Sequence, residues 1–304
     1  MTPSITIGGK TAILTCHVAT HSGRFRRNSR AAIRECLDAG VARIEIDVHS
    51  LDGPDYIVTH DRKLERSTTG SGSIGLATPD AVRALHFLDD ANDRPALLSE
   101  VVEMTRGTNT QLQLDMKDWR LLREPRLRTL LDLVAPIRSQ VIVSAGEDWN
   151  LRLLHASEPE LPIGFDPGRY IGFDDDDPVF LPRTVGAYGY RDDHPLSVGR
   201  TEEPAFYLRQ RMEMLAIQVP ASREMFLDHH LILQMLDDGF DAAEWLHQHG
   251  SELTAWTVDY AGPESKGAVE RLVEAGVDRI TTNTPLAWVE AFRATTKDGP
   301  GGQD

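Results

Sequence analysis

The sequence ARIEIDV (42–48) alternates apolar and charged side chains, as a β-strand does when its two faces meet different surroundings. Its aliphatic side chains fall on one face, and Glu45 and Asp47 fall together on the other. A helical pattern, SRAAIRECLDAG (29–40), precedes the strand, and Gly40 stands where helices commonly end in a left-handed residue. The aliphatic face is expected to pack against helices, which turns the two acids toward the interior of a sheet or barrel.

Eight strand-like runs recur along the chain, and helical patterns lie between most of them. The runs are 11–16, 42–48, 111–116, 140–145, 161–165, 214–219, 253–258 and 278–283. Strands that alternate with helices predict a parallel sheet. Eight such units over roughly 250 residues fit a closed barrel better than an open sheet. The predicted fold is therefore α/β, a (β/α)8 TIM barrel.

We expect a single barrel domain over residues 1–296 with two insertions. The first, about 50–110, begins with the hairpin signal Asp52-Gly53 and forms a small inserted subdomain after strand two. The second lies at about 166–213, and its role as a lid or an oligomer contact is left open. The glycine-rich tail 297–304 is expected to be disordered.

Composition excludes several classes of protein. The 304 residues are 40% hydrophobic and 26% charged, which is unlike disordered, fibrous or membrane-spanning chains. A net charge of −15 predicts no nucleic-acid partner, because phosphates repel an acidic surface. The N-terminal segment lacks the apolar core of a signal peptide, and two cysteines cannot form a disulfide framework, so a cytoplasmic location is expected. The oligomeric state is left open.

Acidic residues gather where the predicted strands end, which is the catalytic end of such barrels. Glu45 and Asp47 face inward from strand two, and Asp115 ends the next barrel strand. Such carboxylates repel one another, and a divalent cation, Mg²⁺ or Ca²⁺, would neutralise them. Pairing of each acid with an arginine or lysine is the alternative. His17 and His60 follow strand-like runs and could act as general base and general acid, or serve only as structural histidines.

Longer motifs resemble the glycerophosphodiester phosphodiesterase family in order and spacing. They are His17, Asn28, EIDVHSLDGPDYIVTHD (45–61), RSTTGSGSIG (66–75), LSEVVEM (98–104), QLDMK (113–117), AWTVD (255–259) and AGVDRITTNTP (275–285). The resemblance implies a metal-dependent hydrolase that cleaves a small-molecule glycerol phosphodiester to an alcohol and glycerol phosphate. If the glycerol hydroxyl of the substrate attacks, a cyclic phosphate forms first and water then opens it.

The resemblance also implies roles for single residues. Glu45, Asp47 and Asp115 are similar to the metal ligands of the family, and His17 and His60 to its acid–base pair. Lys117 resembles the cation that holds the phosphoryl oxygens, and Trp256 resembles an aromatic wall at the mouth of the barrel.

The chain departs from the family pattern at several positions. Val18 stands where the family has an arginine, and Arg24 or its neighbours Arg26 and Arg27 are the candidates to replace it, or are solvated loop charges. Asp115 and Asn283 stand where the family has glutamate and aspartate. Two alternatives therefore stay open: a catalytically weakened barrel that binds a phosphorylated ligand, and a phospholipase D-like lyase that stops at the cyclic phosphate.

Overall fold

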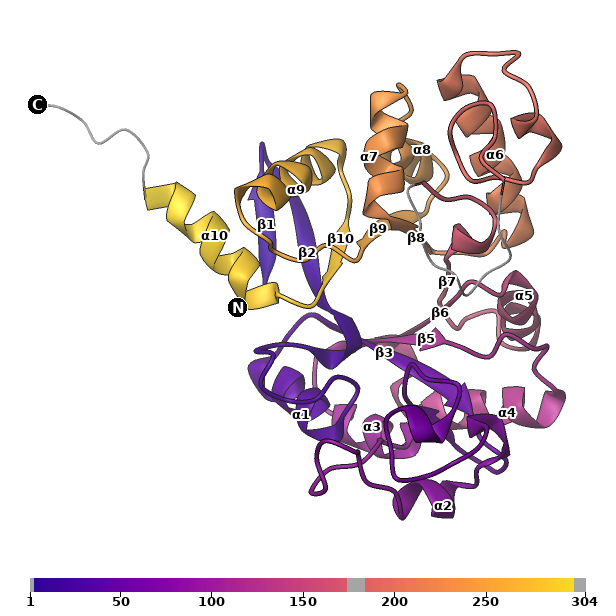
Figure 1. Ribbon diagram of the computed structural model, residues 1–304, viewed down its shortest axis with the longest axis vertical. Helices are drawn as coiled ribbons and strands as arrows, with labels where there is room; N and C mark the ends of the chain where they lie inside the picture. The colour runs from indigo at the N-terminus through magenta and orange to yellow at the C-terminus, as the bar shows by residue number, and fades with distance from the viewer. Residues whose placement is uncertain (1–2, 174–183, 298–304) are drawn as a thin grey trace, which may run out of the picture.

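Short runs of aliphatic and β-branched residues form eight parallel strands that close into a barrel (Figure 1). The computed structural model describes residues 3–173 and 184–297. The barrel strands are β2 (Lys10–Cys16), β3 (Arg43–Ser50), β5 (Gln111–Met116), β6 (Val141–Ala145), β7 (Ile163–Phe165), β8 (Glu224–Asp228), β9 (Glu252–Trp256) and β10 (Arg279–Thr282). Their order is β2-β10-β9-β8-β7-β6-β5-β3, and pairing of β2 with β3 closes the ring. The predicted (β/α)8 barrel is confirmed.

Helices follow the strands and surround the barrel. They are α1 (Arg30–Ala39), α3 (Leu98–Thr105), α4 (Glu124–Val134), α5 (Asp148–Ser157), α6 (Pro204–Gln218), α7 (His229–Asp237), α8 (Ala242–Gln248), α9 (Pro263–Ala275) and α10 (Pro285–Lys297). Figure 1 shows α1, α3 and α4 on one side of the strands and α7, α8 and α9 on the opposite side. Ser29 caps α1 by accepting a hydrogen bond from the backbone of Ala32, and Gly40 ends it with a φ of 63°.

The segment after β3 forms the small inserted subdomain. β4 (Tyr56–Val58) pairs antiparallel with β3, as the Asp52-Gly53 signal predicts, and the short helix α2 (Pro79–Arg83) follows. The segment has a small hydrophobic core of its own, which consists of Leu51, Ile57, Leu64, Ile74, Ala77, Val82, Leu85 and Leu97. Near the N-terminus, β1 (Ser4–Ile7) pairs antiparallel with β2 and extends the sheet.

Short 3₁₀ turns complete the secondary structure. They are η1 (His17–Ala19), η2 (Leu64–Arg66), η3 (Ile74–Leu76), η4 (Ala135–Gln140), η5 (Pro167–Arg169) and η6 (Pro195–Ser197).

One predicted strand is wrong. The run MLAIQV (214–219) lies at the end of helix α6, and the sixth barrel strand is EMFLD (224–228) instead. The run contains only two β-branched residues, and Leu215 continues the buried face of the helix that begins at Pro204, while Met214 and Ile217 are exposed. Leu208, Met212 and Leu215 recur at helical spacing on that face and are all buried.

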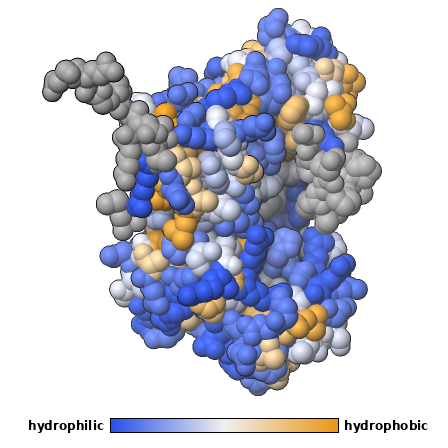
Figure 2. Space-filling view, turned by 60° about the vertical axis from the view of Figure 1, so that its left-hand side comes forward, coloured by the Kyte–Doolittle hydropathy of each residue, from blue (hydrophilic) through white to orange (hydrophobic). Residues whose placement is uncertain are grey.

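The main hydrophobic core lies between the strands and the surrounding helices. Among the described residues, no helix combines the length and apolar character needed to cross a membrane. Figure 2 shows a face on which hydrophilic residues predominate and apolar residues form small groups, in keeping with the acidic composition.

Two predicted segments lie wholly or partly outside the described residues. Lys297, the first residue of the predicted tail, ends α10, and residues 298–304 are outside the described residues. Residues 174–183 of the second insertion are outside them as well.

Candidate active site

Three carboxylates meet at the carboxyl ends of neighbouring strands. Glu45 and Asp47 lie on β3, and Asp115 lies on β5 directly opposite Asp47 in the parallel register. One oxygen from each carboxylate lies within 4.8 Å of the others. The predicted acidic triad is therefore brought together, with Glu45 and Asp47 almost fully buried and Asp115 partly exposed.

Burial and mutual repulsion govern the charge of these acids. Burial raises the pKa of Glu45 well above its usual value, and the charges of Asp47 and Asp115 raise it further. Burial also acts to raise the pKa of Asp47, but Lys117, His60 and a hydrogen bond from Asn28 outweigh it and lower that pKa. The Nδ2 of Asn28 donates to Asp47 Oδ2 at 2.7 Å.

Lys117 lies within the acidic cluster. Its Nζ is 2.5 Å from Asp115 Oδ2 and 3.1 Å from Asp47 Oδ1. Burial acts to lower the pKa of Lys117, but the three carboxylates outweigh it and raise that pKa well above the usual value. Lys117 therefore stays positively charged, and 29% of its side chain remains exposed at the mouth of the barrel.

The cluster fits a hard divalent cation. Glu45 Oε1 is buried and has no hydrogen-bond partner among the described residues, and Asp47 Oδ1 accepts no hydrogen bond despite its ion pair with Lys117. When all three acids are ionised, Lys117 offsets one of their three negative charges. A divalent cation would neutralise the two negative charges that remain. Oxygen-only donors of this kind suit Mg²⁺ or Ca²⁺.

A chain of hydrogen bonds orients His17, which follows β2. Asp259 accepts hydrogen bonds from the backbone N and the Nδ2 of Asn283 at 2.6 and 2.8 Å. The Oδ1 of Asn283 therefore faces His17 Nδ1, at 3.0 Å. Because a side-chain amide oxygen can only accept, Nδ1 carries the proton, and the unprotonated Nε2 faces Glu45 Oε2 at 3.8 Å. Burial lowers the pKa of His17, which favours this neutral form.

The second predicted histidine is His60, which lies near Asp47. His60 follows β4, is exposed, and lies close enough to Asp47 to help lower the pKa of that acid. Its backbone carbonyl lies 3.4 Å from His49 Nε2. His17 and His60 thus reach the acidic cluster from β2 and from the inserted subdomain.

The other two substrate-binding candidates, Trp256 and Arg24, have different surroundings. Trp256 ends β9 at the same end of the barrel, as expected for a wall of the site. Arg24 is not brought to the acidic cluster: its side chain is 72% exposed, pairs with Glu35 at 3.5 Å and stacks on Phe25. Arg26 is likewise held by an ion pair with an aspartate of the inserted subdomain.

Two features of the site could not be assigned from the sequence beforehand. Asp259, which fixes Asn283, stands in the quoted motif AWTVD without any signal of its role. Val18 has a left-handed backbone with a φ of 47°, and its N–H donates to Glu45 Oε2 at 2.6 Å. Val18, which stands where the family has an arginine, therefore contacts the acidic cluster through its backbone.

Comparison with known proteins agrees with this geometry. A sequence model of the glycerophosphoryl diester phosphodiesterase family matches residues 20–166, a range that includes all three acids, His60 and Lys117. Residues 20–166 therefore form a domain of this family. A glycerophosphodiester phosphodiesterase from Caldanaerobacter subterraneus subsp. tengcongensis is 23% identical over 286 residues, which cover 91% of this chain and 97% of that relative.

Solved structures share the fold of this family member. A phosphodiesterase from Oleispira antarctica, in complex with the product sn-glycerol-3-phosphate, is 15% identical with a TM-score of 0.62, covering 94% of this chain and 96% of that chain. A glycerophosphodiester phosphodiesterase from Parabacteroides distasonis is 14% identical with a TM-score of 0.63, covering 93% and 97%. The predictions of the family, the barrel and a phosphodiesterase are confirmed.

Proposed function

We propose that the chain is a metal-dependent phosphodiesterase that cleaves glycerophosphodiesters to glycerol phosphate and an alcohol. The observation that carries the proposal is the buried acidic cluster of Glu45, Asp47 and Asp115, with Lys117 inside it and His17 at its edge. The product bound to the Oleispira antarctica relative is the glycerol phosphate that this reaction would release.

The chain's own residues supply most of the chemistry. Glu45, Asp47 and Asp115 would hold Mg²⁺ or Ca²⁺. When bound, such a cation acts as a Lewis acid toward a phosphoryl oxygen and offsets the charge that develops at phosphorus. Lys117, which stays charged and partly exposed, is placed to bind a second phosphoryl oxygen.

The two histidines divide the proton transfers. His17 Nε2, unprotonated in the tautomer that Asn283 imposes, accepts the proton of the attacking hydroxyl. The new bond from that oxygen to phosphorus forms while the bond from phosphorus to the alcohol oxygen breaks. His60 donates a proton to the departing alkoxide, which leaves as the neutral alcohol. The result is glycerol phosphate, or a cyclic phosphate that water opens in a second step.

A glycerol phosphate release assay tests this assignment. Replacing His17 or His60 with alanine is expected to lower kcat by about 10²–10⁴-fold, because each carries a proton in the reacting step. His86→Ala is the control, since His86 is an exposed histidine of the inserted subdomain. Normal turnover in the two alanine variants, with the melting temperature lowered, would instead assign both histidines a structural role.

The same assay tests the cation. Exhaustive chelation and Asp47→Asn are each expected to abolish turnover, and added Mg²⁺ or Ca²⁺ is expected to restore only the chelated wild type. Full activity after chelation would contradict the metal requirement. Product analysis separates the alternatives: accumulation of cyclic phosphate would indicate a lyase, and binding of glycerol phosphate without turnover would indicate a binding protein.

A further inference from the structure

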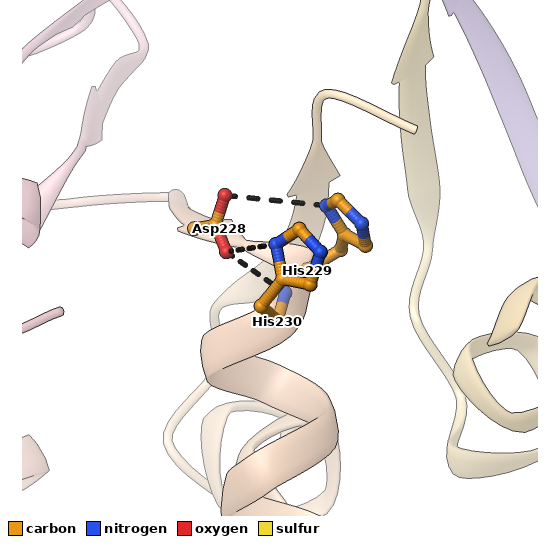
Figure 3. Close-up of side chains that lie close together, drawn as sticks. All are labelled: Asp228, His229 and His230. Carbon is orange, nitrogen blue, oxygen red and sulfur yellow. Dashed lines mark hydrogen bonds and ion pairs between the residues drawn. The ribbon is translucent and has the colours of Figure 1, made fainter. Parts of the chain in front are cut away.

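Asp228, His229 and His230 form a second cluster of ligand-type side chains at the mouth of the barrel (Figure 3). Asp228 ends β8, and α7 begins at the next residue without an intervening loop. The register pairs Asp228 with Trp256, so the cluster lies at the same end of the barrel as the acidic site. In the strand order, β8 stands three strands from β5 and farther still from β3, so the two clusters lie on different sides of the mouth.

The three side chains lie close together, and the two imidazole rings face each other with centroids 3.8 Å apart and planes tilted by 38°. Figure 3 shows the two imidazoles beside the carboxylate of Asp228. His230 Nδ1 lies 3.2 Å from Asp228 Oδ1, His229 Nδ1 lies 4.0 Å from Asp228 Oδ2, and one ligand atom from each residue lies within 4.8 Å of the others. Around a tetrahedral ion with bonds of about 2.0–2.1 Å, neighbouring ligand atoms lie roughly 3.3 Å apart. The separations of 3.2 and 4.0 Å from the Asp228 carboxylate lie on either side of that spacing.

The ligand atoms are available for a cation. Asp228 Oδ1 accepts hydrogen bonds from the backbone N of His230 and Leu231 at 2.8 and 3.3 Å, but Oδ2 accepts none among the described residues. His229 Nδ1 lies 3.3 Å from the carbonyl of Trp256, which can only accept, so Nδ1 carries a proton there and would bind a cation after the proton moves to Nε2. His230 is 55% exposed, so a further coordination position opens to solvent.

The surroundings of the cluster are negative. Within the described part of the chain, Asp228 pairs with no lysine or arginine. Asp166, at the end of β7, has a pKa raised to about 7, chiefly by burial and further by the charges of Asp115 and Asp228. A cation bound by Asp228, His229 and His230 would offset the charge of Asp228.

We infer that Asp228, His229 and His230 bind a transition-metal ion such as Zn²⁺ at a site separate from Glu45, Asp47 and Asp115. The donor chemistry distinguishes the two sites. Two imidazole nitrogens and one carboxylate oxygen suit an ion of borderline softness, whereas three carboxylates suit Mg²⁺ or Ca²⁺. This site does not depend on the proposed hydrolase activity.

Zinc titration of the chelator-stripped full chain tests the inference. Calorimetry with Zn²⁺ in an excess of Mg²⁺, which occupies the all-oxygen site, is expected to find one Zn²⁺ site per chain. A parallel Co²⁺ titration is expected to give the visible absorption of a nitrogen-coordinated ion. His229→Ala and His230→Ala are each expected to weaken Zn²⁺ binding at least about tenfold.

Further variants make the outcome decisive. Asp47→Asn, which disables the all-oxygen site, and His86→Ala, which changes an exposed histidine elsewhere, are both expected to leave Zn²⁺ binding unchanged. Because His230 is exposed, His230→Gln removes a ligand without disturbing the core, and it is expected to weaken binding as His230→Ala does. Wild-type Zn²⁺ affinity in the His229→Ala/His230→Ala double variant, or loss of binding in Asp47→Asn, would overturn the inference.

Discussion

Asn283 determines which nitrogen of His17 carries a proton. Its amide group donates to Asp259 and thereby turns its oxygen toward His17 Nδ1. Burial lowers the pKa of His17 below its usual 6.5, so the histidine is an unprotonated base at neutral pH. A neutral amide at this position orients the imidazole and stabilises its protonated form less than a carboxylate would.

Asn283→Asp is expected to change the pH dependence of catalysis. A carboxylate beside Nδ1 favours protonated His17 and should raise its pKa by about 1–2 units. Because the proposed mechanism needs neutral His17, the acidic limb of kcat/KM is expected to move to higher pH by a similar amount. The pH profile of kcat/KM, together with NMR titration of His17, measures the shift.

A matched substitution far from the site controls this measurement. Asn92→Asp changes the same atoms at an exposed position of the inserted subdomain and is expected to leave the profile unchanged. If the limb stays in place while NMR shows a raised pKa for His17, another group must be the base.

At the scale of elements, the loop between β2 and α1 is held in an unusual backbone conformation. Val18, Ala19 and Asn28 all have positive φ values, of 47°, 57° and 58°. Side chains other than glycine disfavour this region, and asparagine tolerates it better than most. The strain is offset by contacts with the acidic cluster, since Val18 donates to Glu45 and Asn28 donates to Asp47.

Two substitutions at Asn28 are expected to separate the hydrogen bond from the backbone strain. Asn28→Gly loses the bond to the Asp47 carboxylate, which should lower the free energy of unfolding by about 1.5–3 kcal/mol. Asn28→Ala loses the same bond and must also hold a Cβ at positive φ, so a further loss of about 1 kcal/mol is expected. Urea denaturation measures both values, and equal losses would show that backbone strain at this position is negligible.

The sequence predicted most strands because their chemistry is local. Alternation in ARIEIDV and the glycine that ends the preceding helix depend only on neighbouring residues. MLAIQV (214–219) was predicted wrongly because a short apolar run has the same composition at a helix end as in a buried strand. Only the packing of α6 distinguishes the two.

Strand register decides where the predicted acids lie. Glu45, Asp47 and Asp115 converge because parallel strands bring their carboxyl ends together. Arg24 lies in a loop, where neither periodicity nor register fixes the direction of a side chain, and it pairs locally with Glu35 instead. The orientation of His17 depends on β9 and β10, which are more than 230 residues distant in the chain, so no local pattern could predict it.

At the scale of the whole molecule, a buried ion pair links opposite sides of the barrel. Arg43 Nη1 on β3 lies 2.6 Å from Glu224 Oε1 on β8, and both side chains are 2% exposed. Gln111 accepts a hydrogen bond from Arg43 Nε at 2.8 Å, and Thr254 donates to Glu224. Three strands separate β3 from β8 in the sheet order, so this network crosses the barrel interior.

Glu224→Gln is expected to destabilise the fold far more than the loss of a surface pair. The variant leaves Arg43 buried without a charged partner, which should cost about 3–5 kcal/mol of unfolding free energy. Glu252→Gln is the control, because Glu252 pairs with Arg279 but is 49% exposed and should cost less than about 1 kcal/mol. Equal losses in the two variants would show that the network contributes no more than a surface pair.

The acid response of the wild type provides a second measurement of this pair. Burial acts to raise the pKa of Glu224, but Arg43 outweighs it, and the pKa lies below the usual 4.5. A carboxyl group with a lowered pKa in the folded state stabilises the protein above its unfolded-state pKa, and this stabilisation is lost as the pH falls through the folded-state value. The stability difference between wild type and Glu224→Gln, from urea denaturation, should therefore be largest near neutral pH and shrink below about pH 4. A difference that does not change with pH would mean that the destabilisation arises from packing and not from the charge of Glu224.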